Sequence, residues 1–563
     1  MISLRKYDLT PVRLIFLLGL LGLLAVFLVY PLLYVIKGAF WVEDRPTFMF
    51  IWFMISDPAQ WSIVLNSINL GVITTLATTL VSIPLAMVMV RYDFRGKEIM
   101  NGLLLVPMIL PPFVGAVGMR QMFARFGSIN LLLMDAGIIQ QPIDWFGQGD
   151  LIGVIVLQVL HLYPIMYLNV AAALANVDPA MEEAARNVGA SGFTLFRKIT
   201  FPLMLPGYFA GASIVFIWSF TDLGTPLVFE YRRLIAVQIF DLVTDIHGNP
   251  MGYVLVMFMM LLGIAFFSLS KSSMRGRRYE MLVHGQVGRT AKRASIVTSL
   301  LIYGSFFGLT LLALIPHISV VLTSLTERWF MSVLPETFTL KYYSLVFEHH
   351  LTSIAIRNSF MLSSLSTVVD IFAGITIAYL LARTRIPGKS IIDTLTMLPL
   401  AIPGIIIAFG FVAGFSGTFL DARQNPVPLL VCAYAIRRLP YMVRSAYAGF
   451  QQINVSLEEA AQNVGATPAT TLRKITLPLI FANLVAGAIL CFSFAMLEVS
   501  DSLILAIEEN DYPITKALYM LLGRPDGTYI ASALGVLGMF LLMASLVLAG
   551  KFLGRRMGEL FRA

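Results

Sequence analysis

The chain has 563 residues, of which 58% are hydrophobic and only 13% are charged, and its formal net charge is +8. Together with a mean hydropathy of +0.81, this composition excludes a soluble globular protein and indicates a membrane protein with many spans. The basic residues gather in short turns between apolar stretches. Membrane topology therefore accounts for the positive charge, and no nucleic-acid partner is expected.

The apolar stretches predict the fold class. A bilayer core of about 30 Å needs about 20 apolar residues per helix, and hydrocarbon cannot satisfy the edges of an open sheet. We therefore expect an all-α, polytopic membrane protein with about twelve transmembrane helices, six in each half. The predicted spans are roughly 14–36, 62–90, 98–119, 151–175, 208–228, 250–270, 295–325, 354–382, 391–415, 427–449, 484–505 and 529–550.

Lys and Arg mark alternate turns between these spans, which places those turns and both termini on the cytoplasmic side. The marked positions are Arg5, Lys6, Arg13, Arg91, Arg95, Lys97, Arg197, Lys198, the segment 271–293, Arg383, Arg385, Lys389, Arg473, Lys474, Lys551, Arg555 and Arg556.

The two halves repeat one another. Asn66 matches Asn358, and Pro111 matches Pro403, at a spacing of 292 residues, which falls to 276 further along the chain. Because matching turns have the same sidedness, the two six-helix repeats are predicted to be parallel. The predicted organisation is a first lobe at 1–280, a cytoplasmic basic linker at 281–294 and a second lobe at 295–563.

A polar cassette of 25 residues interrupts the spans of each half, at Glu182–Pro206 and again at Glu458–Ala482. The two copies are identical at 15 positions. In each copy the pattern predicts a short helix of roughly two to three turns at the cytoplasmic face.

The two helices are predicted to begin with different caps and to end in the same way. Asp178 is expected to be the N-cap of the first helix, and Ser456 is expected to form a capping box with Glu459. Gly189 and Gly465 are expected to end the two helices in the left-handed conformation.

The cassette resembles the signature of the membrane-spanning permeases of binding-protein-dependent ABC importers, which is Glu-Ala-Ala, three residues, Gly, nine residues, Ile, one residue, Leu-Pro. The second copy matches in full, and the first has Phe201 in place of the Leu. The resemblance implies that each cassette helix couples the permease to an ATPase. The implied coupling residues are Glu182, Glu183, Ala184, Ala185, Gly189, Glu458, Glu459, Ala460, Ala461 and Gly465.

The resemblance also implies partners and a location. Two copies of a cytoplasmic ABC ATPase would bind ATP and Mg, a periplasmic substrate-binding protein would deliver the substrate, and the chain would span a bacterial inner membrane. The sequence contains no G-x-x-x-x-G-K-[ST] loop for nucleotide phosphates. We therefore expect no enzyme activity and no cofactor in this chain, and ATP hydrolysis in a separate subunit.

Polar residues inside the spans are candidates for the translocation pathway, because a charge at bilayer depth is costly and usually faces protein or water. The candidates are Asp222, Thr221, Glu498, Ser500, Asp370, His161, Arg437 and Arg438. The alternative is a structural ion pair, in which Arg437 or Arg438 neutralises Asp370 or Glu498.

The cargo is open at this point. The stretch Asp222–Pro226 resembles ferric iron permeases, whereas intramembrane arginines suit an anion such as a phosphonate or organophosphate; thiamine is a further possibility, and no metal ligands are assigned. An ion-coupled secondary transporter, working through Asp222, Asp370 or Glu498, is the alternative from another class. It does not explain two cytoplasmic cassettes.

Overall fold

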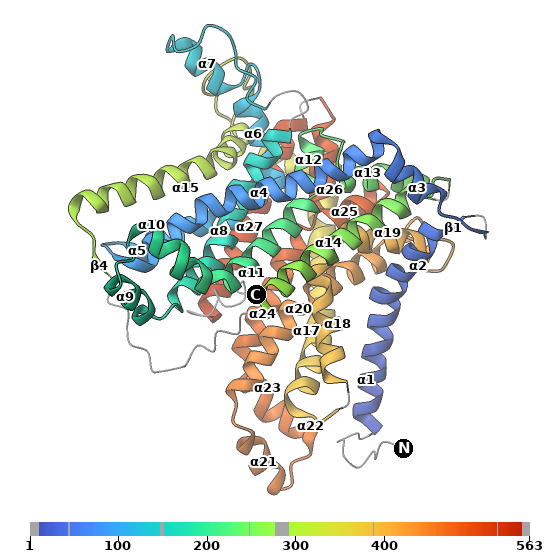
Figure 1. Ribbon diagram of the computed structural model, residues 1–563. Coiled ribbons are helices and arrows are strands. Elements are labelled where there is room, and N and C mark those ends of the chain that lie inside the picture. Colours follow the sequence, from blue (N-terminus) through green and yellow to red (C-terminus); the bar gives the residue numbers. More distant parts are fainter. Residues whose placement is uncertain are drawn as a thin grey trace. The chain divides into compact units, whose positions relative to one another are not determined.

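The computed structural model describes residues 11–42, 45–146, 151–246, 248–275, 292–386, 388–525 and 527–553 (Figure 1). The predicted linker 281–294 lies outside the described residues up to position 291, and so do the outermost residues at both ends.

Helices make up most of the described chain. The helices of the first half are α1 (Pro11–Leu24), η2 (Ala25–Val29), α2 (Tyr30–Phe40), α3 (Met49–Ser56), α4 (Pro58–Arg91), α5 (Lys97–Ile109), α6 (Pro112–Phe123), α7 (Ser128–Asp135), α8 (Leu151–Ala175), α9 (Pro179–Asn187), α10 (Gly192–Leu195), η3 (Phe196–Thr200), α11 (Phe201–Phe220), α12 (Gly224–Val228), α13 (Ile235–Leu242), η4 (Val243–Asp245) and α14 (Met251–Arg275).

The second half contains a similar series. Its helices are α15 (Ile296–Ser324), α16 (Lys341–Glu348), α17 (His350–Arg383), α18 (Lys389–Ala401), α19 (Gly404–Phe415), α20 (Val427–Gln452), α21 (Val455–Asn463), α22 (Pro468–Thr471), η5 (Leu472–Thr476), α23 (Leu477–Leu479), α24 (Phe481–Met496), α25 (Ser500–Leu505), η6 (Glu509–Asp511), α26 (Ile514–Leu522) and α27 (Gly527–Leu553).

Strands are limited, within the described residues, to short pairs. β1 (Trp41–Val42) runs antiparallel to β2 (Arg45–Pro46), and β3 (Tyr92–Asp93) runs parallel to β4 (Lys292–Arg293). The predicted all-α, polytopic class is confirmed.

The repeat predicted from the sequence is also a repeat of structure. Helices α4 and α17 both have 34 residues, α5 and α18 both have 13, and the cassette helices α9 and α21 both have nine. A π-helical turn, η3 or η5, lies at the same place in each cassette. The same local sequence therefore forms the same local structure twice.

The number of straight spans is smaller than the twelve that the apolar stretches predict. By length and composition, seven helices among the described residues could cross a membrane, or up to ten if each bent pair counts as one span. Helix α14 has a shorter apolar part, Met251–Phe266. The predicted span 484–505 is also interrupted, because α24 ends at Met496 and α25 begins at Ser500.

Two of the bent pairs bend at matching prolines. Helices α5 and α6 meet at 87°, and α18 and α19 meet at 102°. Proline disfavours the helical conformation of the residue before it, and both Leu110 and Ile402 are extended, with ψ values of 130° and 122°. Pro111 and Pro403 thus break the predicted spans 98–119 and 391–415.

The described chain forms two compact units that do not coincide with the two sequence halves. Unit 1 contains 11–61, 235–260 and 339–553, and unit 2 contains 62–234 and 261–338. In unit 1, α17, α20 and α24 pack side by side (Figure 1), and α2 packs on α19. In unit 2, α8 packs on α11, and α15 packs on α6. Each unit therefore includes the first long helix of the opposite sequence half.

Matching glycines allow this exchange of helices. A Cβ at Gly118 of α6 would lie 1.8 Å from the carbonyl oxygen of Pro316, and a Cβ at Gly410 of α19 would lie 2.9 Å from the Cβ of Pro31. Only glycine lets α15 and α2 approach so closely, because any side chain would collide with the proline-containing turn. Gly118 and Gly410 are repeat mates, so one packing solution is used in both units.

Candidate functional site: the two cassettes and the buried charges

The first cassette helix begins and ends as its sequence predicts. The Asp178 side chain accepts a hydrogen bond from the backbone N–H of Ala180 at 2.8 Å, and Pro179 is the first helical residue. Gly189 ends the helix with φ +89°, and the Ala190 N–H donates to the Ala185 carbonyl at 2.9 Å. This long backward hydrogen bond is typical of a left-handed helix end.

The second cassette helix ends in the same way but starts differently from the prediction. Gly465 has φ +93°, as predicted. The predicted capping box at Ser456 is wrong: Asn454 is the N-cap, and its side chain accepts from the Ser456 N–H at 3.1 Å. An Asn amide oxygen serves this role as well as a Ser hydroxyl, so the helix starts two residues earlier than predicted, at Val455.

The ten predicted coupling residues divide into an outer and an inner set. Those on the surface are Glu183, Ala184, Gly189, Glu459, Ala460 and Gly465, and those turned inward are Glu182, Ala185, Glu458 and Ala461. Glu182 and Glu458 are only 3% and 9% exposed. The two adjacent glutamates of each cassette thus lie on different faces of the helix, one inward and one exposed, because neighbours differ by about 100° around the helix axis.

Exposed apolar side chains, which the sequence motif does not include, lie on both cassette helices. Val188 and Val464, the last residues before the terminal glycines, are 85% and 86% exposed, and Met181 and Leu457 are about half exposed. Phe193, just beyond the first helix, is 74% exposed. The sequence does carry a signal for this surface, because a valine precedes the terminal glycine in both copies.

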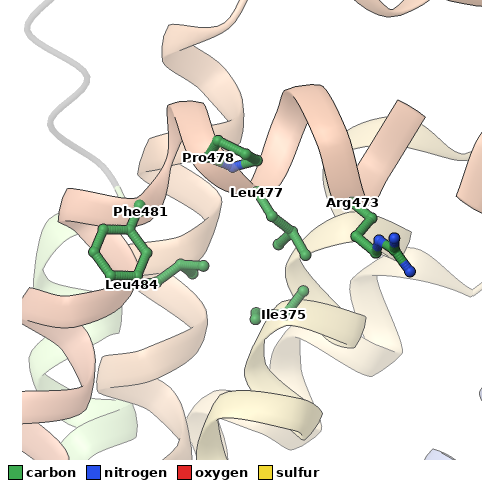
Figure 2. Close-up of a pocket in the computed structure, with 6 residues that line it drawn as sticks. All are labelled: Ile375, Arg473, Leu477, Pro478, Phe481 and Leu484. Atoms are coloured by element: carbon green, nitrogen blue, oxygen red, sulfur yellow. The ribbon is translucent and has the colours of Figure 1, made fainter. Parts of the chain in front are cut away.

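A cavity of about 480 Å³ adjoins the second cassette inside unit 1. Ile375, Arg473, Leu477, Pro478, Phe481 and Leu484 line it. Figure 2 shows Leu477 reaching towards Ile375 across this space. It lies where α23 and α24 meet at a bend of 74°. Arg473 is the charged residue among these six.

Unit 1 also holds a buried cluster of charges, built by α20 and the break between α24 and α25. Arg437 and Arg438 donate to different oxygens of Glu498, and Arg437 Nη1 lies 3.6 Å from Asp501 Oδ2. Glu498 and Asp501 are 6% and 0% exposed. A Cβ at Gly404 would lie 2.2 Å from Arg437 Nη1, so that glycine leaves room for the guanidinium.

Glu498 is therefore the partner of both arginines. Asp370, the other predicted partner, is buried in α17 near Arg438 and Cys491, without an ion pair within the described residues. The Glu498 carbonyl oxygen also accepts from Thr515 at 2.6 Å. Ser500 is the first residue of α25. The cluster joins several segments, as the structural ion-pair alternative predicts.

The matching position in unit 2 is a carboxylate that pairs with no cation among the described residues. Asp222 Oδ2 accepts from Gln158 Nε2 at 3.0 Å, and Asp222 Oδ1 accepts from the Gly224 N–H at 3.1 Å. His161, the repeat mate of Arg437, lies with its Nδ1 2.9 Å from the Pro107 carbonyl oxygen. Thr221 donates to the Ile217 carbonyl at 2.7 Å. The acidic residue at the helix break is shared, but its partners differ between the units.

No cluster of three or more His, Cys, Asp or Glu side chains suited to a metal ion occurs among the residues that the structure describes.

Comparison with known proteins decides the family. Residues 79–278 and 370–559 each match the family described as the binding-protein-dependent transport system inner membrane component, and together they make up more than half of the chain. The chain belongs to this family of permeases. The permease is thus a multi-pass membrane protein and a component of an ABC importer, and such components lack catalytic activity of their own and work with an ATPase and a substrate-binding protein.

Several relatives of the permease are named for their cargo. It is 26% identical over 520 residues to a putative ferric transport system permease protein of Haemophilus influenzae, which covers 88% of this chain and 78% of the relative. It is 25% identical over 495 residues to a ferric transport system permease protein of Actinobacillus pleuropneumoniae, covering 86% and 70%. A molybdate/tungstate transport system permease protein of Thermococcus kodakarensis is 30% identical over 167 residues, covering 30% and 64%.

Proposed function

We propose that the permease carries ferric iron from the periplasm to the cytoplasm by alternating access. Two ATPase subunits, which bind ATP and Mg, drive this transport and contact the permease at α9 and α21. The observation that carries this proposal is the duplicated cassette helix, with fixed ends and an exposed apolar tip in each repeat. In this arrangement both cassettes and both chain termini face the cytoplasm of a bacterial cell, and a periplasmic binding protein supplies the selectivity.

The exposed valines supply the contact in this proposal. Aliphatic groups that are 85% and 86% exposed gain most of their stabilisation when a partner covers them. Glu183 and Glu459 are also exposed on these helices and can pair with a basic groove of the partner. An apolar centre with a charged rim is the usual composition of a specific protein interface.

Aspartate at both valine positions is expected to release the ATPase. Val188→Asp combined with Val464→Asp places a charge in the apolar centre of each contact, where desolvation opposes binding. We expect the ATPase recovered with the purified permease to fall at least about tenfold. The matched control is Phe419→Asp, because Phe419 is 88% exposed but lies outside both cassettes. Equal ATPase recovery from both variants would contradict the docking role.

The assignment of cargo rests on the ferric transport permeases named above, and the pairing of the two arginines weighs against the anion alternative. Arg437 and Arg438 already pair with Glu498, and Asp501 lies 3.6 and 4.0 Å from them, so acidic groups of the protein already occupy these arginines. Phosphonate, organophosphate and thiamine are therefore the weaker candidates.

Uptake by proteoliposomes tests the cargo and the energy source together. The permease, its ATPase and its binding protein are expected to accumulate radioactive iron only with internal ATP, and labelled phosphonate should not accumulate. Proton-driven uptake without the ATPase would instead favour an ion-coupled secondary transporter.

A further inference from the structure

In unit 2, a buried glutamate ties the first cassette helix to two other segments. Arg91 Nη2 donates to Glu182 Oε1 at 2.8 Å, and Thr200 Oγ1 donates to the same oxygen at 2.7 Å. Arg91 is the last residue of α4, and Thr200 is the last residue of η3. The Glu182 side chain is 4% exposed. One carboxylate therefore holds the ends of a long helix and of the π-helical turn against α9.

Unit 1 contains the same contact, made by the repeat mates. Arg383 Nε donates to both oxygens of Glu458 at 3.1 Å, and Thr476 Oγ1 donates to Glu458 Oε1 at 3.1 Å. Arg383 Nη2 also donates to the Phe450 carbonyl at 2.8 Å, at the end of α20. Arg383 is the last residue of α17, as Arg91 is of α4.

The recurrence is informative because the two halves are not related by one uniform shift. The arginines are 292 residues apart, whereas the glutamates and the threonines are 276 apart. The 16-residue difference falls between them in the chain, yet the three side chains meet in both units. The contact is thus kept by the tertiary structure of each repeat and does not follow from local spacing.

We infer that these two contacts, Arg91–Glu182–Thr200 and Arg383–Glu458–Thr476, are latches that position the coupling helices. Each latch makes α9 or α21 rigid relative to α4 or α17, so that a displacement of the short helix is passed to the long one. This inference rests on the proposed function. It assigns Glu182 and Glu458 a positioning role inside the permease, whereas Glu183 and Glu459 provide the contact with the ATPase.

Hydrogen–deuterium exchange on the full permease in lipid nanodiscs, without any partner, tests the latch directly. We expect Glu182→Gln to speed amide exchange in α9 about tenfold, because the amide oxygen can still accept but lacks the negative charge that strengthens the hydrogen bond from Arg91. The adjacent variant Glu183→Gln removes the same charge from an exposed position and is expected to leave α9 exchange unchanged. Helix α21, with an intact latch, is the internal control.

Two further variants test the same contact if Glu182→Gln assembles poorly. Thr200→Val removes only one hydroxyl and should also speed exchange in α9, by a smaller factor. The double variant Arg91→Gln with Glu182→Gln should speed α9 exchange no more than the stronger of the two single variants does, because the two residues form one contact. Equal α9 exchange in Glu182→Gln, Thr200→Val and the parent chain would overturn the inference.

Assays with the ATPase separate this inference from the proposed function. In the loaded complex we expect Glu182→Gln to retain the ATPase and its hydrolysis but to lose at least about tenfold in uptake per ATP hydrolysed. If α9 loosens in the isolated chain while Val188→Asp with Val464→Asp still retains the ATPase, the latch stands and docking through the cassettes fails. If docking holds but α9 does not loosen, the latch fails alone.

Discussion

Proline at Gly189 or Gly465 is expected to reduce substrate uptake at least about tenfold, while membrane insertion and ATP hydrolysis stay near normal. The native φ values of +89° and +93° are closed to proline, whose ring fixes φ near −65°. The substitution also removes the Gly189 N–H, which donates to the Arg186 carbonyl at 2.9 Å, or the equivalent bond of Gly465. The exposed valine at the helix end would then point elsewhere.

Alanine variants separate backbone conformation from steric collision. A Cβ at Gly189 or Gly465 would meet no atom within 4 Å, so alanine costs only the strain of a left-handed residue, about 1 to 2 kcal/mol. We expect uptake by the alanine variants to lie between the proline variants and the parent.

Gly137 provides a matched control for this prediction. It has φ +68°, its N–H donates to the Met134 carbonyl at 3.0 Å, and a Cβ there would also meet nothing within 4 Å. Gly137→Pro imposes the same backbone defect outside the cassettes, and we expect it to transport normally. If Gly189→Pro and Gly465→Pro also transport normally, the cassettes do not couple ATP hydrolysis to transport.

Loss of the Glu498 charge is expected to destabilise the permease by about 3 to 5 kcal/mol. Glu498→Gln removes the carboxylate to which both Arg437 and Arg438 donate, and leaves them only the more distant Asp501 as an acidic neighbour within the described residues. Removal of one member of a buried pair costs far more than the pair contributes. Thermal unfolding in detergent, followed by the loss of monodisperse protein, measures this change. Arg438→Gln combined with Glu498→Gln is expected to recover part of the loss, because one unpaired cation is removed with its partner.

Asp222→Asn is the control, since it changes the repeat mate of Glu498. The Asn side-chain oxygen can still accept from the Gly224 N–H. Its NH2 group can donate to Gln158 Oε1 once the Gln158 amide turns over, because that oxygen has no partner among the described residues. We therefore expect a stability change of about 1 kcal/mol or less. A fall in uptake by this variant without a fall in stability would support a pathway role for Asp222. Equal destabilisation by Asp222→Asn and Glu498→Gln would contradict the view that cation pairing distinguishes the two sites.

The bends show where a sequence signal was present but incomplete. Hydropathy identifies an apolar stretch at 391–415, but it does not indicate whether the helix within that stretch is straight or bent. Pro403 was available as a signal, because it makes the preceding residue extended. The size of the bend, 102°, depends instead on how α19 packs against α2 and α25.

The arginines of α20 show the same division at the candidate site. Their position inside an apolar stretch identified Arg437 and Arg438 as important from the sequence. Asp370 and Glu498 were equally acceptable partners, because both are acidic and both lie within predicted spans. Glu498 is the partner because the break between α24 and α25 lies against α20. The two segments are 60 positions apart, so no local sequence pattern indicates that they meet.

The sequence by itself determined the membrane class, the duplication, the two cassette helices and the glycines that end them. Each of these depends on composition, on periodicity or on contacts within a few residues. The tertiary structure alone decided that α2 and α15 pack with the opposite sequence half, that Glu182 faces inward while Glu183 faces out, and that Arg91 reaches the cassette. These contacts depend on which surfaces, far apart in the chain, pack closely against one another, and that packing is a property of the whole fold.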